Sequence, residues 1–133
     1  MKYISKNHSK FLLMTHLIFV CKYRKKLLIR LGDDIKKLFY AIAEEKDLNI
    51  IEMEVGKDHI HLLVQYSPTQ SILQIVRWFK QISTYRVWRV GKTQYYLNNH
   101  FWQERTFWSD GYFACSIGKV SKETIEKYIQ QQG

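Results

Sequence analysis

The alternation of hydrophobic and polar residues predicts four β-strands along the chain. Residues 11–22 form a run rich in Leu, Ile, Phe and Val, and apolar positions alternate with glutamates in residues 49–55. A Gly-Lys-Asp sequence at 56–58 predicts a tight turn into a third strand at 59–66, which Pro68 ends. Residues 111–117 have the composition of a fourth strand.

Apolar residues at three- and four-residue spacing predict two helices between these strands and one after them. Asp33 or Asp34 can cap a helix that runs to about residue 46, and Ser71 can cap one that runs to about residue 90. After Gly118, Ser121 can cap a last short helix that continues to the end of the chain. Residues 91–110 are rich in aromatic side chains and follow neither period. The expected buried positions are Ile35, Leu38, Phe39 and Ile42 in the first helix, and Ile72, Ile75, Val76, Phe79, Ile82 and Val87 in the second.

This order of elements, β-α-β-β-α-β followed by a helix, predicts the α+β class. Its first six elements give the ferredoxin-like or RRM-like arrangement, a four-stranded antiparallel sheet with both helices on one face. The other face is then left free for a functional site. The chain has one Pro, no low-complexity tract and no linker, so we expect residues 1–133 to form a single domain.

The net charge of +9 is unevenly distributed along the chain. Residues 1–32 hold eight Lys or Arg and no acidic residue, and residues 33–67 hold four basic and eight acidic residues. Residues 68–109 hold six basic residues and one acidic residue, Glu104. Two basic segments around an acidic one indicate a positively charged face that suits nucleic acid. A generally basic protein whose charge serves solubility is the alternative.

The sequence gives no indication of a membrane or export segment. No apolar run reaches the length of a membrane span, and no signal-peptide pattern precedes the first strand, so we expect a cytoplasmic protein without a membrane partner. Cys21 and Cys115 stand outside any CxxC or Cys/His pattern and are expected to be small core residues.

The sharpest local feature is His59-Ile60-His61 in the third predicted strand. Residues two apart on a strand project from the same face, so both imidazoles point one way while Ile60, Leu62 and Val64 point to the core. The open face would then carry two nitrogen ligands for one divalent ion. Two unrelated histidines in a strand are the alternative, because His-x-His alone is a weak motif. A third ligand is not evident nearby, since Asp58 would point to the opposite face if the strand includes it.

Tyr128 lies in the last predicted helix, on the flank of an apolar stripe formed by Ile125 and Ile129. Gln132, four residues later, shares its face. Read alone, such a tyrosine is an ordinary anchor with a buried ring and an exposed hydroxyl.

Four segments together resemble the single-tyrosine HUH transposases of small bacterial insertion sequences, often called TnpA. EVGKDHIHLLV contains the His-hydrophobe-His motif, and HLIFVCKYRKKLL is similar to the family's first strand and basic turn. FWSDGYFACSIG resembles its Trp-x-x-Gly-Tyr-Phe strand, and TIEKYIQQQ its tyrosine helix. The matches occur in order and cover nearly the whole chain, which makes them specific as a set.

The resemblance implies a transposase that cleaves and rejoins single-stranded DNA at the ends of an insertion sequence through a 5′-phosphotyrosine. Tyr128 would be the nucleophile. The metal ligands would be His59, His61 and Gln132, with Gln131 as the alternative third ligand if the helix register differs. Mg²⁺ or Mn²⁺ is the expected ion, and no nucleotide cofactor is needed because a tyrosine ester retains the cleaved linkage. The family also implies a homodimer that recognises DNA hairpins at the element ends.

Two groups of basic residues are candidates for DNA phosphate contacts, with solvated surface charge as the alternative for each. They are Lys22, Arg24, Lys25 and Lys26 after the first strand, and Arg77, Lys80 and Arg86 on the second helix. Residues 89–102 match no part of the family pattern, which leaves the DNA specificity undefined.

Two other functions fit parts of the pattern. A non-catalytic RRM-like nucleic-acid-binding protein would use the open sheet face, but the chain lacks the Gly- and aromatic-rich strand of an RRM and His-x-His would have no role there. An HUH replication-initiation nickase would share the tyrosine and metal chemistry. The short chain and the ordered matches favour the transposase.

Overall fold

The computed structural model describes residues 4–6, 9–116 and 122–132. Its centre is a four-stranded antiparallel sheet in the order β4-β5-β3-β6. The strands are β3 (Leu13–Val20), β4 (Asn49–Val55), β5 (His59–Tyr66) and β6 (Phe113–Cys115). β3 lies between β5 and β6, and its last six residues are all buried.

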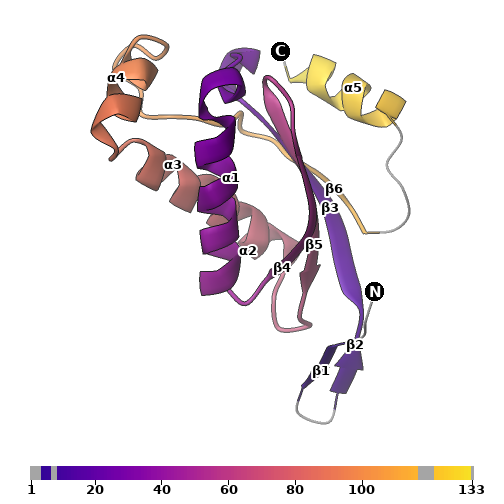
Figure 1. Ribbon diagram of the computed structural model, residues 1–133. Coiled ribbons are helices and arrows are strands. Elements are labelled where there is room, and N and C mark those ends of the chain that lie inside the picture. The colour runs from indigo at the N-terminus through magenta and orange to yellow at the C-terminus, as the bar shows by residue number, and fades with distance from the viewer. Residues whose placement is uncertain (1–3, 7–8, 117–121, 133) are drawn as a thin grey trace.

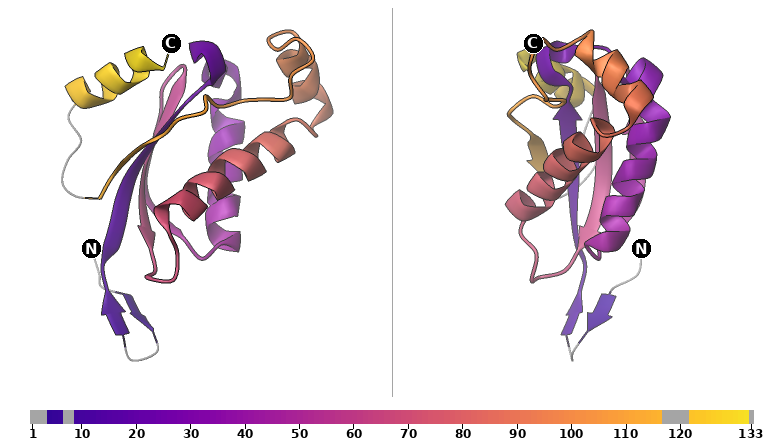
Figure 2. Two further views of the ribbon diagram at one scale, coloured as in Figure 1. Left: turned by 180° about the vertical axis from the view of Figure 1, so that it is seen from behind. Right: turned by 90° about the vertical axis from the view of Figure 1, so that its left-hand side faces the viewer.

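The helices lie on both faces of this sheet (Figures 1 and 2). One face carries α1 (Leu28–Glu45) and a long helix made of α2 (Ile72–Arg77), η2 (Trp78–Ile82) and α3 (Ser83–Val87). α4 (Gly91–Asn98) follows on the same side, and α5 (Lys122–Gln131) lies on the opposite face. The predicted α+β fold with an added C-terminal helix is confirmed, and α5 covers part of the face that was expected to be open.

The predicted β4–β5 hairpin has the observed boundaries, because clear alternation and a Gly-containing turn define both strands. The first strand is shorter than expected: residues 11–22 divide into a separate hairpin strand, β2 (Ser9–Phe11), then β3 and a 3₁₀ turn, η1 (Lys22–Arg24). β2 pairs with β1 (Ile4–Lys6) in a hairpin that extends past one end of the main sheet (Figure 1). The sequence analysis missed this hairpin.

The predicted start of α1 at Asp33 or Asp34 is wrong. α1 begins at Leu28, and both aspartates lie inside the helix. No side chain caps this end. Instead, the Leu28 amide donates to the Lys57 carbonyl in the β4–β5 turn (3.0 Å). The free amide at the start of this helix is therefore satisfied by a carbonyl distant in the sequence, whereas a side chain next to the helix usually satisfies it.

The second predicted helix is correctly placed at its start, where the Ser71 hydroxyl accepts from the Gln74 amide (3.1 Å). It ends at Val87 rather than near residue 90, and residues 78–82 form a π-helical turn. Such turns are rare in soluble proteins and occur mostly at functional sites. The period of the apolar residues does not reveal this turn.

The unassigned region 91–110 contains α4 and then an extended segment that crosses the end of the sheet. In that segment Trp108 pairs with Cys21 in an isolated bridge. The fourth strand is limited to Phe113–Cys115 rather than 111–117. Ile117, Gly118 and the proposed cap Ser121 lie outside the described residues.

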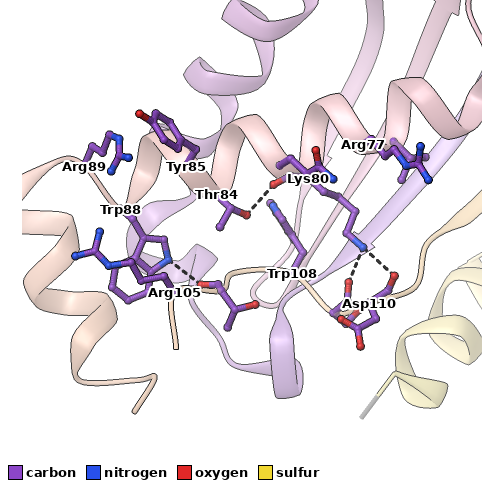
Figure 3. A pocket seen from close by; sticks show the side chains of 13 residues that line it. Arg77, Lys80, Thr84, Tyr85, Trp88, Arg89, Arg105, Trp108 and Asp110 are labelled. Atoms are coloured by element: carbon purple, nitrogen blue, oxygen red, sulfur yellow. Dashed lines mark hydrogen bonds between the residues drawn. The ribbon is translucent and has the colours of Figure 1, made fainter. Parts of the chain in front are cut away.

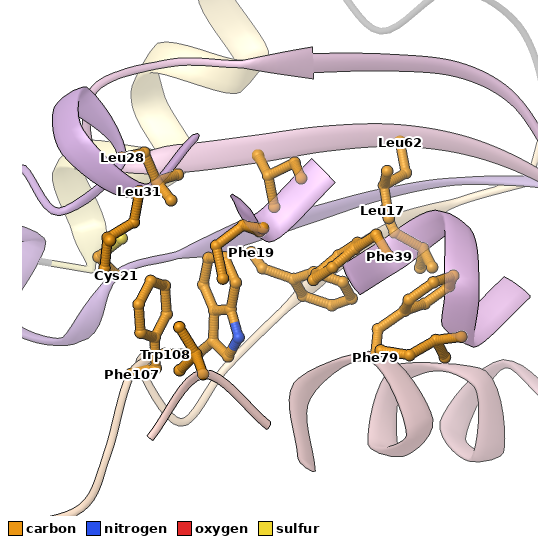
Figure 4. Close-up of a cluster of buried hydrophobic side chains, with 14 of the residues drawn as sticks. Leu17, Phe19, Cys21, Leu28, Leu31, Phe39, Leu62, Phe79, Phe107 and Trp108 are labelled. Atoms are coloured by element: carbon orange, nitrogen blue, oxygen red, sulfur yellow. The ribbon is translucent and has the colours of Figure 1, made fainter. Parts of the chain in front are cut away.

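The main core fills the space between the sheet and the helices of α1 to α3. Phe39 and Phe79 stack with ring centroids 4.9 Å apart (Figure 4). The Phe19 ring contacts both of them, at 6.1 and 6.3 Å, and the Trp108 ring contacts Phe39 at 5.8 Å. The Trp108 indole donates to the Ser83 hydroxyl (3.0 Å), so its buried N–H is satisfied. Cys21 belongs to this core, as predicted.

A second, small cluster lies on the other face of the sheet. Ile18 and Val20 of β3 pack against Ile129 of α5, with Phe113 and Ile125 at the edge. This contact places α5 on the face that carries the β5 histidines. No helix in the part of the chain that the structure describes is long and apolar enough to cross a membrane.

Because Phe79 is fully buried between the sheet and α1, we expect Phe79→Ala to lower the free energy of unfolding by about 3–5 kcal/mol. Leu73→Ala, at a position 46% exposed on the same helix, should change it by less than about 1 kcal/mol. Urea unfolding followed by tryptophan fluorescence measures both values, and equal losses in the two variants would contradict this description of the core.

Candidate active site

β5 places His59 and His61 on the sheet face turned away from the main core. Ile60, Leu62 and Val64 alternate with them and are fully buried in that core. In the register of the sheet, His59 lies opposite Val20 and His61 opposite Ile18. The two histidines therefore adjoin the residues on which α5 packs.

Two neighbours fix the position of the His59 ring. Its Nδ1 lies 2.9 Å from the Asp58 carboxylate, so Nδ1 is the donor in this contact and Nε2 is the ring nitrogen left for a metal. The ring also lies against Gly56, where an added Cβ would approach Nδ1 to 2.7 Å and Nε2 to 2.8 Å. Any larger residue at 56 would push the imidazole out of this position. The sequence analysis gave Asp58 no such role.

His61 contacts a third histidine that sequence reasoning did not include in the site. Its Nε2 lies 3.1 Å from Nδ1 of His16, on the neighbouring strand β3. Burial lowers the pKa of His61, and the adjacent His16 lowers it further, against the opposing effect of Glu54 and Glu52. His61 is therefore held in the neutral form that acts as a metal ligand.

Tyr128 projects from α5 beside Phe113, with ring centroids 5.8 Å apart. Its hydroxyl is buried and has no hydrogen-bond partner among the residues that the structure describes. Burial raises the pKa of Tyr128 to about 12. The expected exposed hydroxyl of an ordinary anchor is therefore not what the structure shows, and a buried, unpartnered hydroxyl requires an explanation.

Gln132 lies beside Tyr128, one helical turn later. Its Oε1 accepts a hydrogen bond from the Ser109 hydroxyl (3.2 Å). A Cβ added at Gly111 would lie 3.2 Å from Gln132 Oε1 and 3.6 Å from the Tyr128 hydroxyl. Gly111 thus lies directly against both side chains, whereas Gln131 is exposed. Of the two candidate glutamines, the structure brings Gln132 next to the tyrosine.

Lys80 holds the segment beneath Gln132 in place. From the π-helical turn η2, its ammonium donates to the carbonyls of Ser109 (2.7 Å), Asp110 (3.0 Å) and Gly111 (3.2 Å). Burial lowers the pKa of Lys80, with Asp110 acting against this change and Lys22 adding to it. Nothing in the sequence distinguishes Lys80 from a surface lysine of an amphipathic helix.

The predicted phosphate-binding residues separate into different environments. Lys22 pairs with Asp110 (3.3 Å), and Arg24 lies 4.0 Å from Asp58, so both adjoin the site. Lys25 contacts the Phe101 ring and Lys26 is exposed.

Arg86 makes a bidentate contact with Glu45 of α1 (2.8 Å to each oxygen), and Arg77 is exposed on α2. DNA contacts by these residues remain a prediction.

The donor set fits a divalent cation with open coordination positions. His59 Nε2 is available, and His61 is neutral, although His16 competes for its Nε2. Across the described ranges, no three His, Cys, Asp or Glu side chains are grouped so that they could hold an ion by themselves. A third protein ligand would therefore be of another type, such as the Gln132 amide oxygen. In the described part of this single chain, no hydrogen bond or ring contact joins Tyr128 to either histidine of the motif.

The chain matches the family model described as "Transposase IS200 like" over residues 9–132. It is 33% identical over 118 residues to the ISDra2 transposase TnpA of Deinococcus radiodurans, covering 88% of this chain and 81% of that protein. It is 28% identical over 131 residues to the IS200 transposase of Salmonella typhimurium, covering 94% and 80%.

Solved structures agree with this assignment. A crystal structure of a proposed transposase from Deinococcus radiodurans has a TM-score of 0.85 and 26% identity, with 99% of this chain and 98% of that chain covered. A REP-associated tyrosine transposase bound to a REP hairpin shares the fold, with a TM-score of 0.57 and 11% identity over 97% of this chain and 68% of that one. Because the family model spans nearly the whole sequence, this chain belongs to the IS200-like transposase family.

Proposed function

We propose that this chain is a metal-dependent transposase that cleaves and rejoins single-stranded DNA at insertion-sequence ends through a 5′-phosphotyrosine on Tyr128. The observation that carries the proposal is the buried Tyr128 hydroxyl without a partner in the described structure. It lies against Gly111 and beside Gln132, on the sheet face that also carries His59 and His61. Leaving a buried hydroxyl unpaired costs free energy, and a phosphate oxygen of the substrate would supply the missing partner.

In the proposed reaction the Tyr128 oxygen attacks phosphorus as the bond between phosphorus and the 3′-oxygen breaks. The phosphate stays on the 5′-oxygen of the downstream fragment as a tyrosine ester, and the upstream fragment leaves with a 3′-hydroxyl. Rejoining is the reverse step with a 3′-hydroxyl as the nucleophile. Since one phosphate ester replaces another, no nucleotide cofactor is needed.

The raised pKa of Tyr128, about 12, means that the phenol keeps its proton in the free protein at neutral pH. The phenol therefore has to release this proton as it attacks. The leaving 3′-oxygen takes up one proton, which balances the one that Tyr128 releases.

The residues proposed to hold Mg²⁺ or Mn²⁺ are His59, His61 and Gln132. A bound ion would supply Lewis-acid polarisation of the scissile phosphate. Asp58 orients His59 through the proton on Nδ1, and the lowered pKa of His61 keeps it neutral. Ser109 orients Gln132 by donating to the same amide oxygen that would serve as a ligand.

The substrate is proposed to be single-stranded DNA with hairpins. The REP-associated relative is described as bound to a REP hairpin, which supports DNA hairpins as ligands of this fold. Lys22 and Arg24 adjoin the site through Asp110 and Asp58 and would reach phosphates near the point of cleavage. The RRM-like alternative is less well supported, because α5 covers Ile18 and Val20 on the sheet face that an RRM leaves for nucleotides.

Covalent trapping tests the proposed chemistry. Protein would be incubated with labelled single-stranded DNA that carries the element-end hairpins, with Mn²⁺ or EDTA, and analysed on a denaturing gel. We expect a Mn²⁺-dependent adduct with the wild type and with Tyr95→Phe, whose residue is 74% exposed on α4, and none with Tyr128→Phe. If no protein forms an adduct although DNA binding is confirmed, a non-catalytic binding protein is the better description.

Gly56→Ala tests the positioning of His59. The added methyl group would overlap the imidazole, so the ring must move, and adduct formation should fall by roughly 10- to 100-fold. Gly91→Ala is the matched control, because a Cβ at Gly91 meets nothing within 4 Å, and it should stay within about twofold of wild type. Equal adduct yields from both variants, with unchanged melting temperatures, would show that His59 is not positioned as described.

A homodimer is also expected from the family resemblance. Size-exclusion chromatography with light scattering should give a species of twice the 16.1 kDa chain mass. A 16.1 kDa species alone, at micromolar concentration and with DNA absent or present, would contradict this expectation.

A further inference from the structure

A groove of about 560 Å³ lies between the long helix and the extended segment before β6 (Figure 3), and Tyr128 is not among the residues that line it. Arg77 and Tyr85 line it from the helix, Arg89 from the turn that follows the helix, and Arg105 from the opposite segment. Its volume is in the range of sites that enclose a small ligand. The transposase chemistry proposed above assigns this groove no function.

The charge of the groove is positive and largely uncompensated. Arg77, Arg89 and Arg105 are exposed, and within the described residues none of them pairs with a carboxylate. Asp110 is the one acidic residue that lines the groove, and it pairs with Lys22. Arg86 on the same helix differs, since Glu45 neutralises it. Three guanidinium groups around one depression favour an anionic ligand.

The groove also offers flat surfaces on which a base can stack. The Arg89 guanidinium lies 3.5 Å from the centroid of the Tyr85 ring, and this tyrosine is 59% exposed. Stacked arginine and aromatic side chains are surfaces on which unpaired bases are held. Trp88 and Trp108 are buried, and their indole N–H groups already donate to Thr106 and Ser83. These two residues form the floor of the groove.

One end of the groove leads to the candidate active site. Lys80 and Asp110 line this end, and the Lys80 ammonium holds the backbone carbonyls of residues 109–111. Ser109, which also lines the groove, donates to Gln132 on α5. Residues 109–111 thus connect this end of the groove to Gln132 on the other side of the sheet.

We propose that this groove binds an unpaired segment of the DNA strand, with phosphates at Arg77 and Arg105 and a base stacked on the Tyr85–Arg89 pair. The inference rests on the proposed function, since it concerns the same substrate. Paired bases within a duplex present no free face to such a surface. The groove is therefore specific for single-stranded rather than duplex DNA.

Fluorescence anisotropy tests this proposal, with all variants made in a Tyr128→Phe background so that no strand is cut. The probes are a labelled oligonucleotide of twelve thymidines and a blunt duplex of twelve base pairs. We expect the double variant Arg77→Gln with Arg105→Gln to bind the thymidine probe at least roughly tenfold more weakly at low salt. The slope of log affinity against log salt should fall by about 0.7 for each lost phosphate contact.

Tyr85→Ala should weaken binding of the thymidine probe by roughly tenfold without changing that slope, because it removes stacking rather than charge. Lys37→Gln, which removes an exposed cation of α1 outside the groove, should stay within about twofold. Duplex binding should change less than thymidine binding in every groove variant. Unchanged thymidine binding, or equal losses for the duplex or for Lys37→Gln, would overturn the proposal.

Crosslinking separates this inference from the proposed chemistry. A single-stranded probe with 5-iodouracil should crosslink to Tyr85, and a crosslink found only at other residues would overturn the placement. If groove variants lose thymidine binding while the wild type forms no tyrosine adduct, the groove stands and the proposed chemistry fails. If the wild type forms the adduct and the groove variants bind the thymidine probe normally, the proposed chemistry stands and the groove proposal fails.

Discussion

Strand β3 is buried on both of its faces, and the position of the candidate site depends on this double burial. Leu17 and Phe19 enter the main core between the sheet and the helices, while Ile18 and Val20 form the surface on which Ile129 of α5 packs. An antiparallel strand usually alternates apolar and polar residues because one face meets water. Here every residue from 15 to 20 is buried, so the tyrosine helix is attached to the same strand that anchors the core. His61 lies opposite Ile18 in the register of the sheet, and the docking of α5 therefore brings Tyr128 to the histidine face.

Around this contact, the polar side chains of the site are positioned by partners outside the motif itself. Asp58 and Gly56 determine the orientation of His59, and His16 contacts His61. Lys80 reaches from the helices on the far side of the sheet to hold the segment 109–111, on which Gln132 and Tyr128 rest. The ligand and nucleophile candidates are thus supported from both layers of the fold. Supporting contacts of this kind determine ligand geometry as much as the ligands themselves.

The parts of this structure that follow from local patterns could be predicted from the sequence. The β4–β5 hairpin, the shared face of His59 and His61, and the buried stripe of the second helix depend on alternation, helical spacing and turn residues. The start of α1 could not be predicted, because the Leu28 amide donates to the carbonyl of Lys57, which is distant in the sequence. The roles of Lys80, Ser109 and His16 arise from tertiary contacts between segments 23 to 45 residues apart. The position of Gln132, rather than Gln131, beside Tyr128 depends on the packing of α5 against Gly111, which helical spacing does not predict.

The central claim is that Tyr128 is the residue that becomes joined to DNA. Mass spectrometry of the covalent complex, after digestion of the DNA with nuclease and of the protein with trypsin, tests this most directly. Cleavage after Lys127 releases the C-terminal peptide that begins with Tyr128 and holds no other tyrosine. We expect this peptide to carry the mass of the residual nucleotide, and fragmentation to assign that mass to the tyrosine. A nucleotide found on any other peptide, with the C-terminal peptide recovered unmodified, would contradict it.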